Sequence, residues 1–290
     1  MTMTPETFYA SAEPRRIEVE DATIAVRSFG SGPALVLIHG FPVHGYTWRA
    51  LLPTLAERYS CFVVDLPGLG DSGWNDATDF SFTGQARRLA ALLPRLGIDR
   101  CALLAHDTGA TVARLLALAE PARVAKLAIL NTEIPGHRPP WIPLYQKLTR
   151  VPGAGAVFRV LLSQNWFVRS GMGFGAFYSD RRLFDDPTRL APYLDPVLAS
   201  SQRMKGMLLY LQGPEWEAVD GLRTRHAQLE IPVLLLWGED DVTFPVALAE
   251  PMASQFGGPT TFVRIARASL MPHEERPEAV LASLLPFLEA

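Results

Sequence analysis

The residues whose order points most directly to chemistry are Ala105-His106-Asp107-Thr108-Gly109. A predicted strand, "RCALLAH", meets a predicted helix here with almost no linker, and small residues flank Asp107 at two positions. Such a cramped strand-to-helix turn is typical of a nucleophile elbow, which raises its middle side chain above the sheet. The carboxylate would lie near a helix N-terminus, where negative charge is favoured. The same residues also fit a simple helix N-cap at Asp107.

A carboxylate at an elbow favours a different reaction from a serine hydroxyl. Serine suits acyl transfer, whereas a carboxylate attacking an acyl group would give an anhydride. A carboxylate is well suited to displacing a halide, or opening an epoxide, at a saturated carbon. The product is an ester on Asp107 that water must then hydrolyse. A serine-type carboxylesterase is therefore disfavoured.

Three further motifs follow predicted strands: "LIHGFPVHGYTW", "DLPGLGDS" and "LLWGEDDVTFP". With the elbow, they make the chain resemble α/β-hydrolase-fold enzymes of the branch whose nucleophile is aspartate. That branch contains haloalkane dehalogenases, fluoroacetate dehalogenases and epoxide hydrolases, and the resemblance covers nearly the whole chain. It implies Asp107 as nucleophile, Asp241 as the acid, and the backbone N–H groups of Phe41 and Thr108 as an oxyanion hole.

The resemblance also implies roles for lid residues. Epoxide hydrolases protonate the opened oxygen with two lid tyrosines, whereas haloalkane dehalogenases hold the halide with tryptophan N–H groups. Thr108 and Phe41 depart from the tryptophan and asparagine that many haloalkane dehalogenases carry, and Thr108 also departs from the arginine of fluoroacetate dehalogenases. Tyr193 and Trp216 are further candidates, and each tryptophan also fits ordinary packing. The predicted substrate-binding residues are His39, Trp141, Tyr145, Trp166, Tyr178 and Tyr210.

The segment "ASLMPHEERPE", residues 268–278, departs from the family pattern Gly-His-Phe-Pro-x-Glu-Glu-x-Pro. Counting back from Pro277 places the expected catalytic histidine at position 270, where Leu270 stands. His273 follows three residues later, either as a displaced base or as a surface or capping residue of the last predicted helix. His39, His44, His106, His137 and His226 are weaker candidates, since His106 should face away from its neighbour on a strand.

Two carboxylates remain that would normally orient the histidine. One is Asp241, and the other is Glu133 in "LNTEIP", which matches an alternative acid position of some haloalkane dehalogenases. Either can activate water directly, although an unperturbed carboxyl pKa of about 4 makes a feeble base unless burial or Asp107 raises it.

Three hypotheses follow. The first is a hydrolase with unconventional or impaired hydrolysis of the Asp107 ester, the second is a half-enzyme that traps the ester, and the third is a ligand-binding protein without turnover. The elbow and Asp241 favour the first two, and Leu270 favours the last two. We favour the hydrolase, acting on an alkyl halide or an epoxide.

Composition limits the other possibilities. The 290 residues suit one large α/β domain. The net charge is −3, and the 27 basic and 30 acidic residues are well mixed, so the sequence indicates no basic surface that would bind nucleic acid or an anionic membrane. The N-terminus lacks a signal-peptide stretch, and no run of about 18 apolar residues is present. Cys61 and Cys101 lie in apolar runs and are expected as buried free thiols. We expect a cytoplasmic protein with a small hydrophobic organic substrate and with no cofactor or metal.

The elements that must position these residues alternate between strand and helix, which predicts a mostly parallel sheet flanked by helices. Strands are predicted at 17–30, 33–40, 60–66, 100–106, 124–132, 231–238 and 260–266. Helices are predicted at about 46–57, 82–96, 109–120, 245–256 and 274–289. The alternation breaks over residues 132–225, which are rich in aromatics, Gly and Pro. We predict a helical cap there, inserted into a core formed by 1–131 and 226–290.

Overall fold

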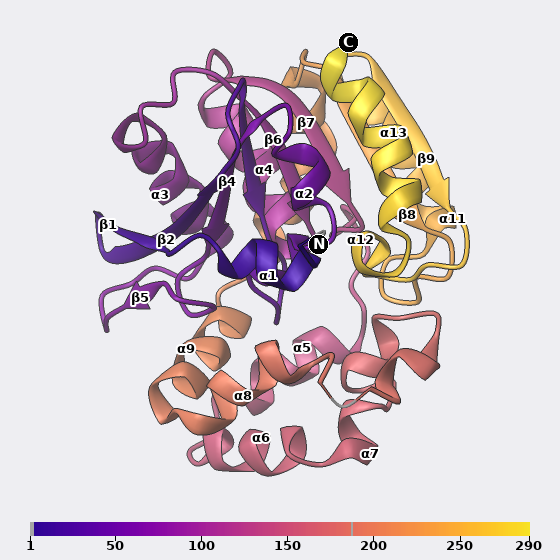
Figure 1. Cartoon of the computed structure of the whole chain (residues 1–290). Helices are drawn as coiled ribbons and strands as arrows, with labels where there is room; N and C mark the ends of the chain where they lie inside the picture. Colours follow the sequence, from indigo (N-terminus) through magenta and orange to yellow (C-terminus); the bar gives the residue numbers. More distant parts are fainter. Residues whose placement is uncertain (1–2, 187) are drawn as a thin grey trace.

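The structure is a computed structural model that describes residues 3–186 and 188–290 (Figure 1). A twisted sheet runs through its upper part, with helices on both faces. A separate group of helices lies below the end at which the parallel strands finish (Figure 1). Loops at that carboxyl end of a parallel sheet are where α/β proteins build their sites.

The sheet has nine strands in the described residues, in the order β1-β2-β4-β3-β6-β7-β8-β9, with β5 paired to β2. The pairs from β4–β3 to β8–β9 are parallel, whereas β2 pairs antiparallel with β1, β4 and β5. The strands are β1 Arg15–Val19, β2 Ala22–Phe29, β3 Ala34–Ile38, β4 Ser60–Asp65, β5 Gly73–Trp74, β6 Cys101–His106, β7 Val124–Leu130, β8 Val233–Gly238 and β9 Thr260–Ile265.

The strands predicted between residues 33 and 266 are confirmed, with small differences at their ends. The prediction of one strand over 17–30 is wrong, because the chain turns at Glu20, where φ is 54°, and returns as an antiparallel partner. The two-residue strand β5 was not predicted from the sequence.

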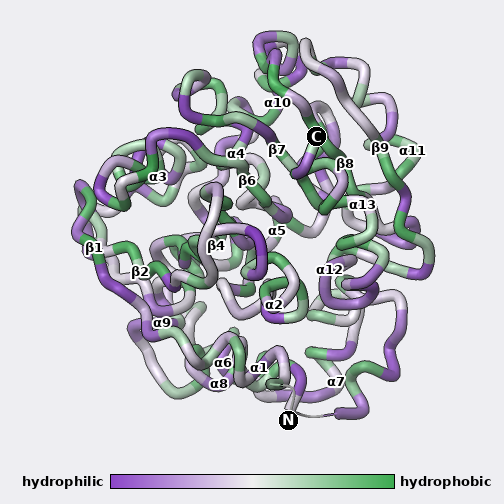
Figure 2. Tube along the Cα trace, turned by 45° about the horizontal axis from the view of Figure 1, so that its top comes forward, coloured by the Kyte–Doolittle hydropathy of each residue, from purple (hydrophilic) through white to green (hydrophobic). Residues whose placement is uncertain are grey.

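Side chains of each central strand alternate between two hydrophobic cores. On β3, Leu35 and Leu37 belong to one core, and Val36 and Ile38 belong to the other. This is the two-residue period of a strand buried on both faces. The central strands are accordingly mostly hydrophobic, as the green tube along β6 and β8 shows (Figure 2).

Helices cover both faces of the sheet. The predicted helices at 82–96 and 109–120 are confirmed as α3 and α4, whereas each of the other three predicted helices is divided into two shorter elements. A proline at the first turn of α2, η5 and α13 marks the start of a new element in each case. The core helices are α1 Pro5–Ala10, η1 Gly45–Trp48, α2 Leu52–Leu55, α3 Phe82–Arg95, α4 Thr108–Ala119, η4 His226–Gln228, α11 Val246–Ala249, η5 Glu250–Gln255, α12 Pro272–Glu275 and α13 Pro277–Glu289.

A helical insertion lies between β7 and β8, and most of its helices form the cap below the sheet (Figure 1). The last of them, α10, contacts the core elements η4 and η5. The helices are α5 Trp141–Leu148, α6 Ala154–Leu162, α7 Asn165–Val168, η2 Phe174–Ala176, η3 Arg181–Phe184, α8 Ala191–Ala199, α9 Ser201–Gln212 and α10 Trp216–Arg225. No helix among the described residues is long and apolar enough to span a membrane.

The cap is joined to the core through the buried carboxylate of Glu274. Its oxygens accept hydrogen bonds from Tyr178 and Tyr193 of the cap and from Thr47 and Arg49 of the core. Burial opposes ionisation of Glu274, but Arg49 lowers its pKa to about 2. The charge therefore persists at neutral pH and holds the cap against the core.

Candidate active site

Asp107 stands on a strained turn between β6 and α4. Its backbone has φ 51° and ψ −130°, a conformation that side-chain-bearing residues rarely adopt. A Cβ added to Gly109 would lie 2.1 Å from the carbonyl oxygen of His39, so only glycine allows the helix to start this close to β3. The turn has the geometry of a nucleophile elbow. It holds the carboxylate of Asp107, which is 6% exposed, at the edge of a cavity.

The two predicted oxyanion-hole groups both reach this carboxylate. The N–H of Phe41 donates to Oδ2 of Asp107 at 2.8 Å, and the N–H of Thr108 also bonds the carboxylate. A Cβ added to Gly40 would lie 2.4 Å from Cβ of Asp107, so glycine at position 40 lets the loop approach. Two backbone donors beside one carboxyl group are an arrangement that can stabilise an oxyanion formed there.

The electrostatic environment of Asp107 opposes its negative charge. Burial raises its pKa well above the usual range, and the charges of Glu133 and Asp241 raise it further, while the two backbone N–H groups lower it. Among the described residues, no Lys, Arg or His side chain lines the cavity to balance these carboxylates. Asp107 therefore holds its proton to a higher pH than an exposed carboxyl group would.

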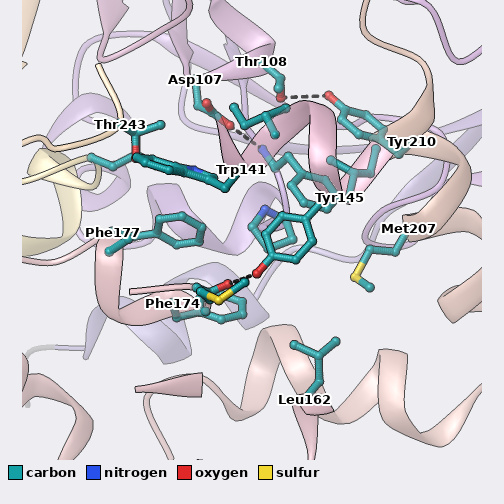
Figure 3. A pocket seen from close by; sticks show the side chains of 18 of the residues that line it. Asp107, Thr108, Trp141, Tyr145, Leu162, Phe174, Phe177, Met207, Tyr210 and Thr243 are labelled. Atoms are coloured by element: carbon teal, nitrogen blue, oxygen red, sulfur yellow. Dashed lines mark hydrogen bonds between the residues drawn. The ribbon is translucent and has the colours of Figure 1, made fainter. Parts of the chain in front are cut away.

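The cavity beside Asp107 lies between the sheet and the cap and has a volume of about 140 Å³ (Figure 3). Its wall is mainly aromatic and aliphatic, and Trp141, Tyr145 and Tyr210 are part of it, as predicted. The aromatic-rich segments of the cap were the only signal for further residues of this wall. The cap residues that line it and were not predicted from the sequence include Phe158, Phe167, Phe174, Phe177 and Met207.

Tyr210 is the phenol beside the nucleophile. Its hydroxyl lies 3.0 Å from Oγ1 of Thr108, and its ring stacks on Phe41 with centroids 5.7 Å apart (Figure 3). Tyr145 instead donates its hydroxyl to the carbonyl of Met172 at 2.6 Å (Figure 3). Of the predicted tyrosines, Tyr210 is thus the one placed to act on a group bound at Asp107.

Three predicted substrate-binding residues do not line the cavity, and these predictions are wrong. Tyr178 donates to Glu274 in the cap–core junction, and Trp166 is 67% exposed on the outside of the cap. His39 is fully buried, where Nε2 accepts from the N–H of Leu66 at 2.9 Å. Burial lowers the pKa of His39 to about 4, so it serves the loop as a neutral structural side chain.

Leu270 lines the cavity at the position where the family pattern has its histidine. His273 is completely buried in the core and does not line the cavity, so the predictions of a displaced base and of a surface residue are wrong, although it does lie in the first turn of a helix. It lies in the single turn α12, with Nε2 2.6 Å from Oγ1 of Thr47 and its ring 4.6 Å from that of Trp48. No other histidine of the described chain lines the cavity either.

The two predicted carboxylates lie at the ends of neighbouring strands, β7 and β8. Asp241 accepts hydrogen bonds from Asn131 at 2.6 Å and from the N–H groups of Thr243 and Phe244 at 2.7 and 3.1 Å. Burial nevertheless raises its pKa to about 7. Asp241 does not line the cavity, so it lies behind the wall and acts on Asp107 through its charge.

Glu133 does line the cavity. Its Oε2 accepts from Oγ1 of Thr111 at 2.6 Å and lies 2.9 Å from Oγ1 of Thr132. Behind them, the fully buried Arg114 donates to these hydroxyls at 2.7 and 3.0 Å and to the carbonyl of Glu133 at 3.0 Å. None of these three partners was predicted from the sequence, where the one signal was the apolar spacing of α4, which carries Thr111 and Arg114.

The described residues contain no group of three His, Cys, Asp or Glu side chains placed to hold a metal ion. Cys61 and Cys101 are buried free thiols, as expected, and burial raises the pKa of each to about 12. Neither thiol is near the cavity wall.

Comparison with known proteins places this geometry in a family. The family model described as the alpha/beta hydrolase fold matches residues 33–277. The chain is 40% identical over 105 residues to a pimeloyl-[acyl-carrier protein] methyl ester esterase of Aeromonas hydrophila, covering 36% of this chain and 40% of that protein. It is 28% identical over 266 residues to a haloalkane dehalogenase of Bradyrhizobium diazoefficiens, covering 83% of each. Epoxide hydrolases are also among its relatives.

The matches differ in extent. For several curated relatives the chain spans only 40% to 54% of their length. Among solved structures, an alpha/beta hydrolase fold protein from Burkholderia ambifaria has a TM-score of 0.80 and 26% identity, with 94% of this chain and 97% of that chain covered. The parallel sheet, the elbow and the family match agree: the chain belongs to the alpha/beta hydrolase fold family.

Proposed function

We propose that the protein is a hydrolase that attacks a saturated, electrophilic carbon through Asp107 and forms an alkyl ester on it. The observation that carries this proposal is a carboxylate at the elbow, facing a largely apolar cavity and held by two backbone N–H groups. The carboxylate displaces a halide, or opens an epoxide, and the ester carbonyl then lies among the same two donors. Relatives named haloalkane dehalogenase and epoxide hydrolase support this reaction class.

The cavity favours a neutral, hydrophobic substrate. No cationic side chain of the described residues lines it, so a substrate carboxylate would meet Asp107 and Glu133 without a counter-charge. An anionic substrate is therefore disfavoured, although a fluoroacetate dehalogenase of Burkholderia is among the relatives. The aromatic wall, with Trp141 and Tyr145, accommodates an alkyl or aryl group.

An esterase of the serine type remains disfavoured despite the matching methyl ester esterase. The elbow presents Asp107, and the neighbouring hydroxyl of Thr108 is engaged with Tyr210 at 3.0 Å. Acyl transfer would need a hydroxyl at the elbow and a base to activate it.

Hydrolysis of the Asp107 ester is the difficult step. Leu270 supplies no base, and Glu133 is the other carboxyl group among the described residues that line the cavity, so it can act on water. A carboxylate is a weaker general base than histidine at neutral pH. Leu270 therefore also supports a second candidate function, in which the protein keeps the ester as a covalent adduct or binds a ligand without turnover.

An intact-protein mass spectrum after incubation with bromobutane or styrene oxide tests the proposal. An alkyl adduct located on Asp107, or released alcohol or diol that Asp107→Asn no longer forms, would support it. A lasting adduct without product would assign the trapping function. Neither adduct nor product from any short bromoalkane or epoxide would remove Asp107 from such chemistry.

A further inference from the structure

Most of the exposed large hydrophobic side chains lie on the cap. Ten such side chains are exposed among the described residues, and seven of them fall within the short segment 144–172. Single exposed hydrophobic residues are ordinary on a protein surface, but a concentration of this kind marks an interaction surface. The seven, which we call the cap patch, are Leu144, Leu148, Val151, Val157, Val160, Trp166 and Met172.

The helix α6 shows that this surface is not the outer side of an ordinary amphipathic helix. Ala154 and Phe158 are buried within the cap, yet Val157 and Val160 on another side of the helix are exposed. Arg159 is its one charged residue. A surface helix normally presents polar residues to water, and a helix that is apolar on several sides is normally covered on each of them. Figure 1 shows α6 and α7 at the end of the cap farthest from the sheet, where the apolar side chains face outward.

The charge of the cap differs in sign from that of the rest of the chain. Residues 132–225 have 12 basic and 8 acidic side chains, whereas the whole chain has 27 and 30, so the core carries the excess of negative charge. The segment 134–179, which contains the cap patch, has five basic side chains and no acidic one. Three of the five form no ion pair with any described residue: Lys147, Arg150 and Arg159.

This combination fits a lipid surface better than a second copy of the chain. A bilayer that contains anionic lipid presents negative headgroups above apolar tails, and so complements both the basic and the apolar side chains. Two caps brought face to face would instead place like charges against each other, which opposes association. Trp166, which is 67% exposed, belongs to the residue types that favour the membrane–water interface.

We propose that the cap patch and the basic side chains beside it dock the protein on the surface of a bilayer that contains anionic phospholipid. The apolar side chains enter the headgroup region, and Lys147, Arg150 and Arg159 face the lipid phosphates, so no helix needs to span the membrane. The even mixing of charge along the whole chain had indicated no such surface, but the fold gathers positive charge and exposed apolar side chains on the cap. The docking itself does not depend on the proposed function.

The cavity reaches the protein surface within the cap patch. Gly171 and Met172 line the cavity and are exposed, and the hydroxyl of Tyr145, another wall residue, donates to the carbonyl of Met172. A docked protein therefore turns this side of the cavity toward the lipid. A neutral hydrophobic substrate concentrates in a bilayer, so docking brings the cavity close to it. This consequence, unlike the docking, rests on the proposed function.

Flotation of the protein with lipid vesicles tests the proposal. One set of vesicles contains phosphatidylcholine alone, and the other contains one part phosphatidylglycerol to three parts phosphatidylcholine. We expect binding to the anionic vesicles, weaker binding to the neutral ones, and release as the salt concentration rises from about 0.1 M to about 1 M, because salt screens surface charges. No binding to the anionic vesicles would overturn the proposal, and a dimer in solution that Val160→Glu dissociates would then assign the cap patch to a second copy.

Substitutions of matched exposure locate the docking surface. Leu148→Glu is expected to lower the affinity for anionic vesicles by about 10-fold or more, since a buried leucine is lost and a negative charge is added. Leu248→Glu on α11 is the control, because Leu248 is 47% exposed and Leu148 is 44% exposed, but Leu248 lies outside the cap. Equal losses of affinity in the two variants would show that only net charge matters and would contradict the assigned surface.

The basic side chains are tested in the same way. Arg150→Glu should lower the affinity for anionic vesicles by about 10-fold, and Arg100→Glu, at an exposed position of the core, should leave it nearly unchanged. Brominated lipids then report contact, because they quench an indole that enters the bilayer. The wild type should be quenched, and Trp166→Phe should lose most of this quenching. Unchanged quenching in Trp166→Phe would place another face of the protein on the bilayer and would overturn the proposal.

Discussion

The main-chain carbonyl of Leu270 accepts a hydrogen bond from Nε2 of His106 at 2.8 Å. The ring of His106 packs on that of His273 with centroids 4.6 Å apart, and neither ring lines the cavity. The loop after β9 therefore turns an aliphatic side chain toward Asp107 and leaves the nearby imidazoles enclosed in the core. Burial lowers the pKa of both histidines, that of His106 to about 4, so both are neutral at physiological pH.

Leu270→His is expected to speed hydrolysis of the Asp107 ester by about 100-fold or more, the usual contribution of a placed general base. The side chain at 270 already faces the cavity, and the segment that carries Asp241 bonds the same loop, because the N–H of Asp240 donates to the carbonyl of Ala268 at 2.9 Å. The decay of the bromobutane adduct in intact-protein mass spectra measures this rate. Leu270→Gln is the control of similar size without a base; equal decay in the two variants would show that the loop does not aim residue 270 at the ester.

Asp107→Asn is expected to raise stability at neutral pH. The pKa of Asp107 is higher in the folded state than the ordinary value of about 4, so the folded wild type binds its proton more tightly. The protonated carboxyl group of Asp107 therefore contributes to wild-type stability at low pH. This contribution is lost as the pH rises toward the pKa of Asp107 in the folded protein. The gain in Tm of the variant should grow as the pH rises above about 4, the ordinary carboxyl pKa; a constant difference would mean that Asp107 titrates normally.

Glu133→Gln is expected to move alkylation of Asp107 to lower pH. The attacking species is the carboxylate, and the charge of Glu133 raises the pKa of Asp107. Removing that charge makes Asp107 ionise at lower pH, so the rising limb of the alkylation rate with bromobutane should shift toward acid. The exposed Glu217→Gln provides the matched control and should leave the profile unchanged. An unshifted limb in Glu133→Gln would show that the two carboxyl groups do not interact.

Gly40→Ala is expected to lower alkylation of Asp107 by about 100-fold, the usual cost of displacing a reacting group by about 1 Å. The new Cβ would lie 2.4 Å from Cβ of Asp107 and 2.6 Å from its Oδ2, so the nucleophile or the loop must shift. Gly221→Ala on α10, where no neighbouring atom lies within 4 Å, should keep full activity and gain up to about 1 kcal/mol of stability. Full alkylation in Gly40→Ala would mean that the loop can retreat without disturbing the site.

The sequence located the parts of the site that depend on neighbours along the chain. Asp107, Thr108 and Gly109 form one turn, and their order alone indicated the elbow that the structure shows. The order of residues in the loop after β3 likewise predicted the backbone N–H of Phe41 as a donor at the site, and this N–H does bond the carboxylate of Asp107. These features are local, so a short motif can encode them.

The sequence could not identify the residues that approach from elsewhere. Tyr178 and Tyr210 were equal candidates, because both are aromatic residues of the insertion, yet one bonds Glu274 and the other lies beside Thr108. The direction of a cap side chain depends on how several short helices pack on one another. The same reason explains why Trp166 is exposed while Trp141 lines the cavity.

The sequence by itself determined the α/β fold, the inserted cap and the absence of a histidine at position 270, since periodicity and motif spacing are properties of the chain. Only the tertiary structure decided that His273 is sealed in the core and that Glu133 shares a cavity with Asp107 while Arg114 lies behind it. Those relationships join residues on different strands and helices, and burial and charge act through space. The chemistry left to a site without its histidine therefore depends on packing that no short motif records.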